Sequence, residues 1–135
     1  MSDKTINTTK EFLDNLKYDP QGLMTAVIQD VANNEVLMVA YMNREAIEKT
    51  LQGPYVNFYS RSRNKMWIKG ESSGHTQTVK EVYFDCDIDC LLIKVEQKVA
   101  ACHVGYRTCF FRKIEGDKVI LVGEKAFEEE SVYKK

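Results

Sequence analysis

Residues 23–42, "LMTAVIQDVANNEVLMVAYM", decide the fold class of this chain. Two apolar runs rich in β-branched residues, 23–30 and 36–42, flank the short segment "VANNE". Asn33 and Asn34 are residues that tolerate the backbone conformations of tight turns. The pattern therefore predicts a β-hairpin, and with it a domain built mainly from strands.

Short helices are expected on either side of this hairpin. Residues 8–17, "TTKEFLDNLK", place a Thr cap before apolar residues at helical spacing. Asn43 is a typical cap for 44–51, "REAIEKTL", which the Gly-Pro pair at 53–54 ends. A third helix, charged and weakly patterned, is expected over 124–135.

The rest of the chain predicts further strands. Each of these runs is short, apolar or aromatic, and bounded by polar or turn residues. They are 55–60, 65–69, 78–85, 91–96, 108–114 and 118–122. We therefore expect an α+β, mostly β fold: a compact barrel-like or mixed sheet of short strands with two or three small helices.

The length, composition and charge of the chain limit the classes of protein to which it can belong. The 135 residues are the length of a single domain, 1–135, and 44% hydrophobic with 29% charged residues is typical of a globular protein. With 19 basic and 20 acidic residues, the net charge of −1 gives no attraction to nucleic acid or to an anionic membrane. No apolar run could span a bilayer, and the N-terminus lacks a signal peptide. We expect a cytoplasmic protein with a small-molecule partner.

Residues 85–90, "DCDIDC", concentrate acid and thiol in one place. In an extended strand Asp85, Asp87 and Asp89 would share one face, about 7 Å apart. A straight strand cannot wrap them around one ion, so either the chain bends here or some bind through water, as Mg²⁺ permits. The alternative is a solvated strand edge whose charges discourage pairing with another strand.

Cysteines offer a second candidate metal site. In a reducing compartment, thiols are better read as metal ligands or catalysts than as disulfides. Cys86, Cys102 and Cys109 would give zinc three soft ligands and leave one position open, which is the catalytic arrangement. Three thiolates outweigh the charge of the ion, so a second cation or a protonated His103 would have to compensate. The alternative is three buried, inert thiols.

Four motifs together resemble one known family. They are "EVLMVAYMNREAIEKTL" (35–51), "YSRSRNKMWIKGESSGHTQ" (59–77), "DCDIDCLLIKVEQ" (85–97) and "ACHVGYRTCFF" (101–111). In this order and spacing they resemble phosphoribosyl-AMP cyclohydrolase of histidine biosynthesis, and the resemblance extends over about residues 18–114.

The resemblance implies a reaction and its metals. The substrate would be 1-(5-phosphoribosyl)-AMP, whose adenine ring is opened hydrolytically between N1 and C6 by zinc-activated water. The enzyme would also use magnesium and would be a homodimer with zinc ligands from both subunits and so with shared active sites. Carried over residue by residue, the zinc ligands are Cys86, Cys102 and Cys109, and the magnesium ligands are Asp85, Asp87 and Asp89.

Catalytic and substrate-binding residues follow from the same motifs. His103 adjoins Cys102, and imidazole is a side chain suited to proton transfer near neutral pH. Guanidinium groups and a Gly/Ser loop can bind two phosphates, and an indole can stack on a purine. The candidates are Arg61, Arg63, Trp67, Lys69, Ser72, Ser73 and Gly74. Each has an ordinary alternative: a surface arginine, a solvated turn or a core tryptophan.

Some residues depart from the family pattern or fit it less clearly. Cys90 lies outside the implied ligand set, and His75 could do no more than hydrogen-bond locally. Val99 and Val104 stand where Gly and Thr are expected. Two competing functions stay open. One is another zinc hydrolase of nucleobases or nucleotides, such as a deaminase, although the H-x-E…P-C-x-x-C signature of deaminases is absent. The other is a non-enzymatic module whose zinc joins a dimer.

Overall fold

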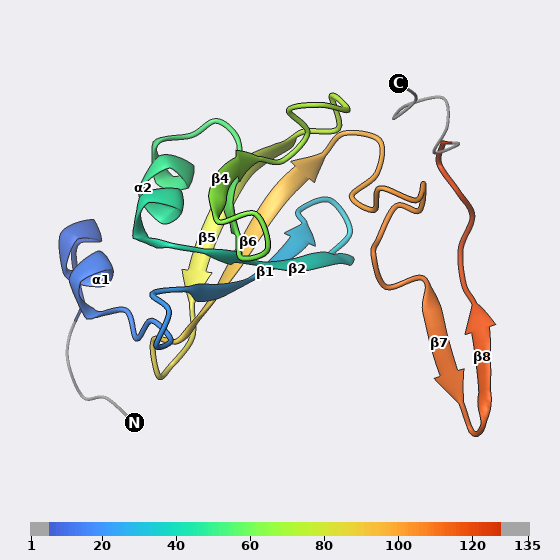
Figure 1. Ribbon diagram of the computed structural model, residues 1–135, viewed down its shortest axis with the longest axis horizontal. Helices are drawn as coiled ribbons and strands as arrows, with labels where there is room; N and C mark the ends of the chain where they lie inside the picture. The colour runs from blue at the N-terminus through green and yellow to red at the C-terminus, as the bar shows by residue number, and fades with distance from the viewer. Residues whose placement is uncertain (1–5, 128–135) are drawn as a thin grey trace.

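The protein is built on a four-stranded mixed sheet, seen in a computed structural model that describes residues 6–127 (Figure 1). The strands, in the order β2-β1-β6-β5, are β1 (Met24–Asp30), β2 (Val36–Met42), β5 (Gln77–Phe84) and β6 (Cys90–Gln97). β1 is antiparallel to β2 but parallel to β6, and β6 is antiparallel to β5. The α+β, mostly β class and the mixed sheet are confirmed. Within the described residues the sheet does not close, so the barrel-like alternative is not observed.

The β1–β2 hairpin lies where residues 23–42 predict it. The backbone N–H of Asp30 donates to the carbonyl of Glu35 at 2.8 Å and closes the turn. Asn34 adopts a positive φ of 63°, which asparagine tolerates better than most residues. β1 buries every second side chain, as a strand with one face on a core should.

The core lies where β1 and β6 run side by side. Ala26 and Ile28 of β1 and Ile93 and Val95 of β6 are fully buried. Because β1 and β6 are parallel and about sixty residues apart in sequence, this pairing depends on long-range packing rather than on a local turn.

Helix α1 (Thr9–Asn15) begins at the expected threonine. The Thr8 hydroxyl accepts from the backbone of Glu11, and the Glu11 carboxylate accepts from the backbone of Thr8, which together form a capping box. Phe12 and Leu13 join the core of the sheet.

Helix α2 (Arg44–Gln52) is capped by Asn43, whose side chain accepts from the backbone of Ala46 at 2.8 Å. It ends at Gly53, which has a φ of 73°. Ile47 is buried against the sheet. Neither helix in the described part of the chain is long and apolar enough to cross a membrane.

Two small hairpins complete the described chain. β3 (Asn57–Ser60) pairs with β4 (Lys65–Ile68), next to α2 and β2. β7 (Arg112–Glu115) pairs with β8 (Lys118–Leu121), and every residue of these two strands is exposed. Figure 1 shows the β7–β8 hairpin projecting away from the sheet.

Residues 85–89 form a turn, because a left-handed residue within them bends the chain, which is one of the arrangements left open above. Two local expectations are wrong. Residues 108–111 are not extended into a strand, and β7 begins only at 112. Residues 124–127 are not helical, and the rest of the expected third helix, 128–135, lies outside the described residues.

Candidate functional site

The turn between β5 and β6 brings the acidic residues together. Asp85 accepts backbone hydrogen bonds from Asp89 at 2.9 Å and from Cys90 at 3.1 Å. Ile88 has a φ of 62° and is buried, so its side chain anchors the turn in the core. The bent alternative of the sequence analysis is therefore the one observed.

The three carboxylates converge at the surface. Oxygen atoms of Asp85, Asp87 and Asp89 lie within 4.8 Å of one another, and all three residues are exposed. Hydrogen bonding to Asp87 and Asp85, with the repulsion of their charges, raises the pKa of Asp89 to about 6. Partial burial opposes ionisation of Asp85, but hydrogen bonds from the Asp89 and Cys90 backbone lower its pKa. Such an oxygen-rich, mutually repelling set fits a hard cation such as Mg²⁺.

A second cluster lies in the loop after β6. The backbone N–H of Cys109 donates to the carbonyl of Leu37 in β2 at 2.7 Å, which brings the thiol back to the sheet. Arg107 fixes the same loop by pairing with buried Asp30 and by donating to the Val99 carbonyl at 3.0 Å. Because the loop is tied to two strands, its thiols are held in place.

Two of the three candidate zinc ligands are neighbours in this loop. Cys102 is buried, whereas Cys109 is exposed. Burial, the charge of Cys102 and a hydrogen bond that the Cys109 thiol donates to Cys102 raise the pKa of the Cys109 thiol to about 11, and Lys69 opposes this rise. Metal binding would therefore have to displace a thiol proton.

Lys69 lies beside this thiol pair. Its Nζ atom donates to the carbonyl oxygen of Ala101 at 2.6 Å. Burial lowers the pKa of Lys69, and the charges of Cys109 and Cys102 favour its ammonium form. The structure thus supplies a cation next to the thiols, a role the sequence analysis assigned only to a second metal or to His103.

Cys86 does not join the other two thiols within one chain. It lies in the turn before β6, and Cys102 lies in the loop after β6, a strand whose eight extended residues span about 23 Å. Among the described residues, the acidic turn is the only set of three or more His, Cys, Asp or Glu side chains with ligand atoms within 4.8 Å. A three-cysteine site therefore needs a ligand from elsewhere.

Two histidines and one cysteine complete the polar groups nearby. His103 is exposed in the loop next to Cys102. His75 is only 8% exposed, its Nδ1 has no hydrogen-bond partner among the described residues, and burial lowers its pKa. Cys90 is half-buried, and burial raises the pKa of its thiol.

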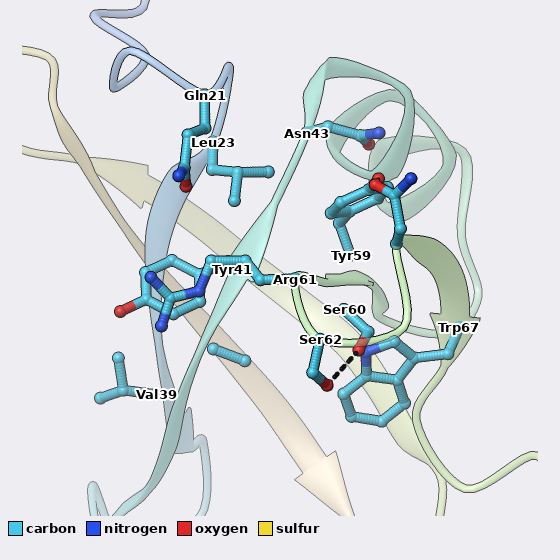
Figure 2. A pocket seen from close by; sticks show the side chains of 12 residues that line it. Gln21, Leu23, Val39, Tyr41, Asn43, Tyr59, Ser60, Arg61, Ser62 and Trp67 are labelled. Carbon is cyan, nitrogen blue, oxygen red and sulfur yellow. Dashed lines mark hydrogen bonds between the residues drawn. The ribbon is translucent and has the colours of Figure 1, made fainter.

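A cavity of about 900 Å³ opens between β2 and the β3–β4 hairpin (Figure 2). Arg61 lies over the ring of Tyr41 at 4.1 Å, and Trp67 packs against Phe58 with ring centroids 4.9 Å apart. The cavity is lined by Gln21, Leu23, Val39, Ala40, Tyr41, Asn43, Tyr59, Ser60, Arg61, Ser62, Asn64 and Trp67.

The expected substrate-binding residues divide into separate places. Arg61 and Trp67 line the cavity, whereas Arg63 is exposed outside its lining and Lys69 faces the thiols. The loop of Ser72, Ser73 and Gly74 is held by its own contacts: the Ser73 hydroxyl accepts from the backbone of His75 at 3.1 Å, and Gly74 donates to Gly70 at 2.8 Å.

Comparison with known proteins identifies the family. A family model described as phosphoribosyl-AMP cyclohydrolase matches residues 38–111. The chain is 56% identical over 119 residues to the phosphoribosyl-AMP cyclohydrolase of Methanosarcina mazei, covering 88% of this chain and 96% of that one. The chain belongs to the phosphoribosyl-AMP cyclohydrolase family.

Other cyclohydrolases support the same assignment. The one from Pelotomaculum thermopropionicum is 56% identical over 124 residues, covering 91% of this chain and 96% of that one. The histidine biosynthesis bifunctional protein HisIE of Thermoanaerobacter pseudethanolicus is 48% identical over 124 residues, covering 92% of this chain and 57% of that one. The family resemblance inferred from the four motifs is confirmed.

The cyclohydrolase match contains every candidate metal ligand and most of the cavity. The sequence analysis missed Tyr41, Tyr59 and Asn64 as cavity residues and Lys69 as a neighbour of the thiols. Their proximity depends on how the β3–β4 hairpin packs beside β2, which no local pattern shows. The only indication of these residues in the sequence was that they lie within the family motifs.

Proposed function

We propose that this chain is a zinc-dependent, magnesium-using hydrolase that opens the adenine ring of 1-(5-phosphoribosyl)-AMP between N1 and C6, in the cytoplasm. The product is the phosphoribosyl-formimino imidazole-carboxamide nucleotide of histidine biosynthesis. The observation that carries the proposal is the pairing of Cys102 and Cys109 beside Lys69, in a chain that also holds three convergent carboxylates next to Cys86.

The zinc ligands in this proposal are Cys86, Cys102 and Cys109. When bound, zinc supplies acidified water as the nucleophile. The Lys69 ammonium offsets part of the excess negative charge of the thiolates, which would otherwise make that water less acidic. The donor set is soft and leaves a fourth position open, as a catalytic zinc site requires.

His103 is the residue assigned to proton transfer in the proposed reaction. Water adds at C6, the C6–N1 bond breaks, and N1 leaves with a proton, without any change of oxidation state. His103 is exposed next to Cys102, so it can reach a substrate at the thiols and transfer that proton. Asp85, Asp87 and Asp89 would hold Mg²⁺ near the nucleotide phosphates.

We further propose that the active form is a homodimer with shared sites. Two observations support it. Cys86 lies at the opposite end of β6 from Cys102, so a second copy is the nearest source of the missing thiol. The β7–β8 hairpin exposes Ile114 (78%), Val119 (68%) and Leu121 (62%), and an isolated two-stranded hairpin is at best marginally stable in water.

The direct test supplies 1-(5-phosphoribosyl)-AMP to the purified, zinc- and magnesium-loaded protein and follows loss of the purine absorbance, with the product identified by mass spectrometry. We expect the mass to rise by one water, with both phosphoribosyl groups retained. Loss of ammonia instead would identify a deaminase. An intact nucleotide would refute the proposed reaction.

A further inference from the structure

We propose that the cavity between β2 and the β3–β4 hairpin binds one 5-phosphoribosyl group of the substrate, with Arg61 as the ligand of its phosphate. This inference rests on the proposed function, which requires a site for each of two such groups. The volume of about 900 Å³ is within the range of small-molecule sites.

The positive charge of the cavity lining suits an anionic ligand. Among residues 6–127, Arg61 is the only charged residue that lines it, and no carboxylate does. Arg44 and Arg107 are engaged in ion pairs, whereas Arg61 makes none among the described residues. A phosphate would therefore meet an unpaired guanidinium in a site without competing negative charge.

The guanidinium is also held in a defined place. Its central carbon lies 4.1 Å from the centre of the Tyr41 ring, a cation–π contact that holds one face of the group and leaves its N–H edges available. Figure 2 shows the Arg61 and Tyr41 side chains stacked at one side of the cavity. Such preorganisation lowers the entropic cost of binding.

Polar groups around the rest of the cavity suit a sugar. Asn43 uses its side-chain oxygen to cap α2, and its NH₂ group makes no hydrogen bond among the described residues. The Tyr59 hydroxyl donates to the side-chain oxygen of Asn64, and the Ser60 and Ser62 hydroxyls lie 3.3 Å apart. These hydroxyl and amide groups can donate to and accept from ribose hydroxyls.

The cavity adjoins the thiol pair, as a substrate site must. The Trp67 ring in its wall lies 5.9 Å from Lys69 Nζ, which bonds to the residue before Cys102. Val39, also in the wall, follows by two residues Leu37, whose carbonyl accepts from Cys109. A nucleotide anchored by its phosphate at Arg61 would therefore extend its base toward the thiols.

Trp67 provides the test because it is the only tryptophan in the chain. The metal-loaded protein is titrated with AMP, ribose 5-phosphate or adenosine, with excitation at the red edge of the indole band, where adenine does not absorb. We expect AMP and ribose 5-phosphate to change the emission saturably. Arg61→Met should weaken both affinities at least about tenfold, while adenosine binding changes little.

Matched variants separate binding from structure. Lys65→Met removes one positive charge from the same hairpin but outside the cavity lining, and it should change AMP affinity less than about twofold. Tyr41→Phe retains the ring under Arg61 and should bind AMP like the wild type. Tyr41→Leu removes the ring and should weaken binding.

The outcomes distinguish this proposal from the proposed function. Normal ring opening with an unchanged KM in Arg61→Met would overturn the cavity proposal alone. Phosphate-dependent binding without ring opening would support the cavity and refute the reaction. If Arg61→Met changes the sedimentation coefficient but not AMP affinity, the cavity is a subunit interface and the proposal is wrong.

Discussion

The Nζ atom of Lys69 lies 2.6 Å from the carbonyl oxygen of Ala101, which places a half-buried ammonium group beside the Cys102 and Cys109 thiols. The carbonyl fixes the direction of the side chain, and the protein pays a desolvation cost to keep the charge there. A cation held in this way favours the thiolate form of its neighbours, which is the form that binds metal.

Removing this charge should weaken zinc binding. We expect Lys69→Met to lower zinc affinity about tenfold or more, the usual effect of losing a group that supports metal ligands. Competition with a chromogenic chelator measures it. Lys98→Met, which removes an exposed positive charge from the residue after β6, is the control and should bind zinc normally. Equal zinc affinity in all three proteins would show that Lys69 does not act on the thiols.

Shared zinc sites predict that two inactive variants restore each other. Cys86→Ser and Cys109→Ser should each lose zinc and activity, because each lacks one ligand in every site. If the two are unfolded together, mixed and refolded, heterodimers should contain one site with all three cysteines. We expect about a quarter of wild-type activity, since half of the dimers are mixed and each has one intact site.

The control for this experiment is Cys90→Ser, which should retain zinc and activity alone. Complementation would not occur if one chain supplied all three ligands, since no mixed dimer would then hold a complete set. If either single variant retains activity, the cysteine replaced in that variant is not a zinc ligand.

The acidic turn predicts opposite effects of Asp89→Asn with and without magnesium. The folded protein raises the pKa of Asp89 to about 6, above the ordinary value of 3.8. The folded state therefore binds more protons between these values, and stability falls as the pH rises through them. Without Mg²⁺, Asp89→Asn should stabilise the protein at pH above 6, and this gain should vanish below about pH 4.

With Mg²⁺ present, the wild type should be more stable than Asp89→Asn, because the ion binds the wild-type carboxylates. Urea unfolding with and without Mg²⁺ at several pH values measures both effects. Asp117→Asn, in the exposed turn between β7 and β8, should not change the response to Mg²⁺. If Mg²⁺ changes the stability of Asp89→Asn and wild type equally, the turn is an ordinary solvated edge and not a magnesium site.

The exposed hairpin predicts a contribution to dimer formation. Ile114→Gln removes an apolar side chain that is 78% exposed in the single chain, and it should weaken self-association without unfolding the protein. Sedimentation over a range of concentrations measures the change. Lys113→Gln, next to it in β7, introduces the same side chain at a polar position and should have little effect. Equal dimerisation of both variants would contradict the assigned role of the hairpin.

Local features of the fold followed from the sequence because short-range physics decides them. The β1–β2 turn needs a residue that accepts a positive φ, and Asn34 provides it. Thr8 and Asn43 begin helices because their side chains satisfy free backbone N–H groups. At 85–89 the sequence left a bent and a straight chain open, and buried Ile88 with the Asp85 hydrogen bonds shows the bend.

The strand-rich class, the helix caps, the family and the kinds of residue that can bind metal were predictable from the sequence, because each depends on neighbours in the chain or on a motif. Three relationships became known from the folded chain: β1 lies parallel to β6, Lys69 meets Cys102 and Cys109, and Cys86 lies apart from them. These relationships join segments tens of residues apart, and burial of the common core selects which segments meet.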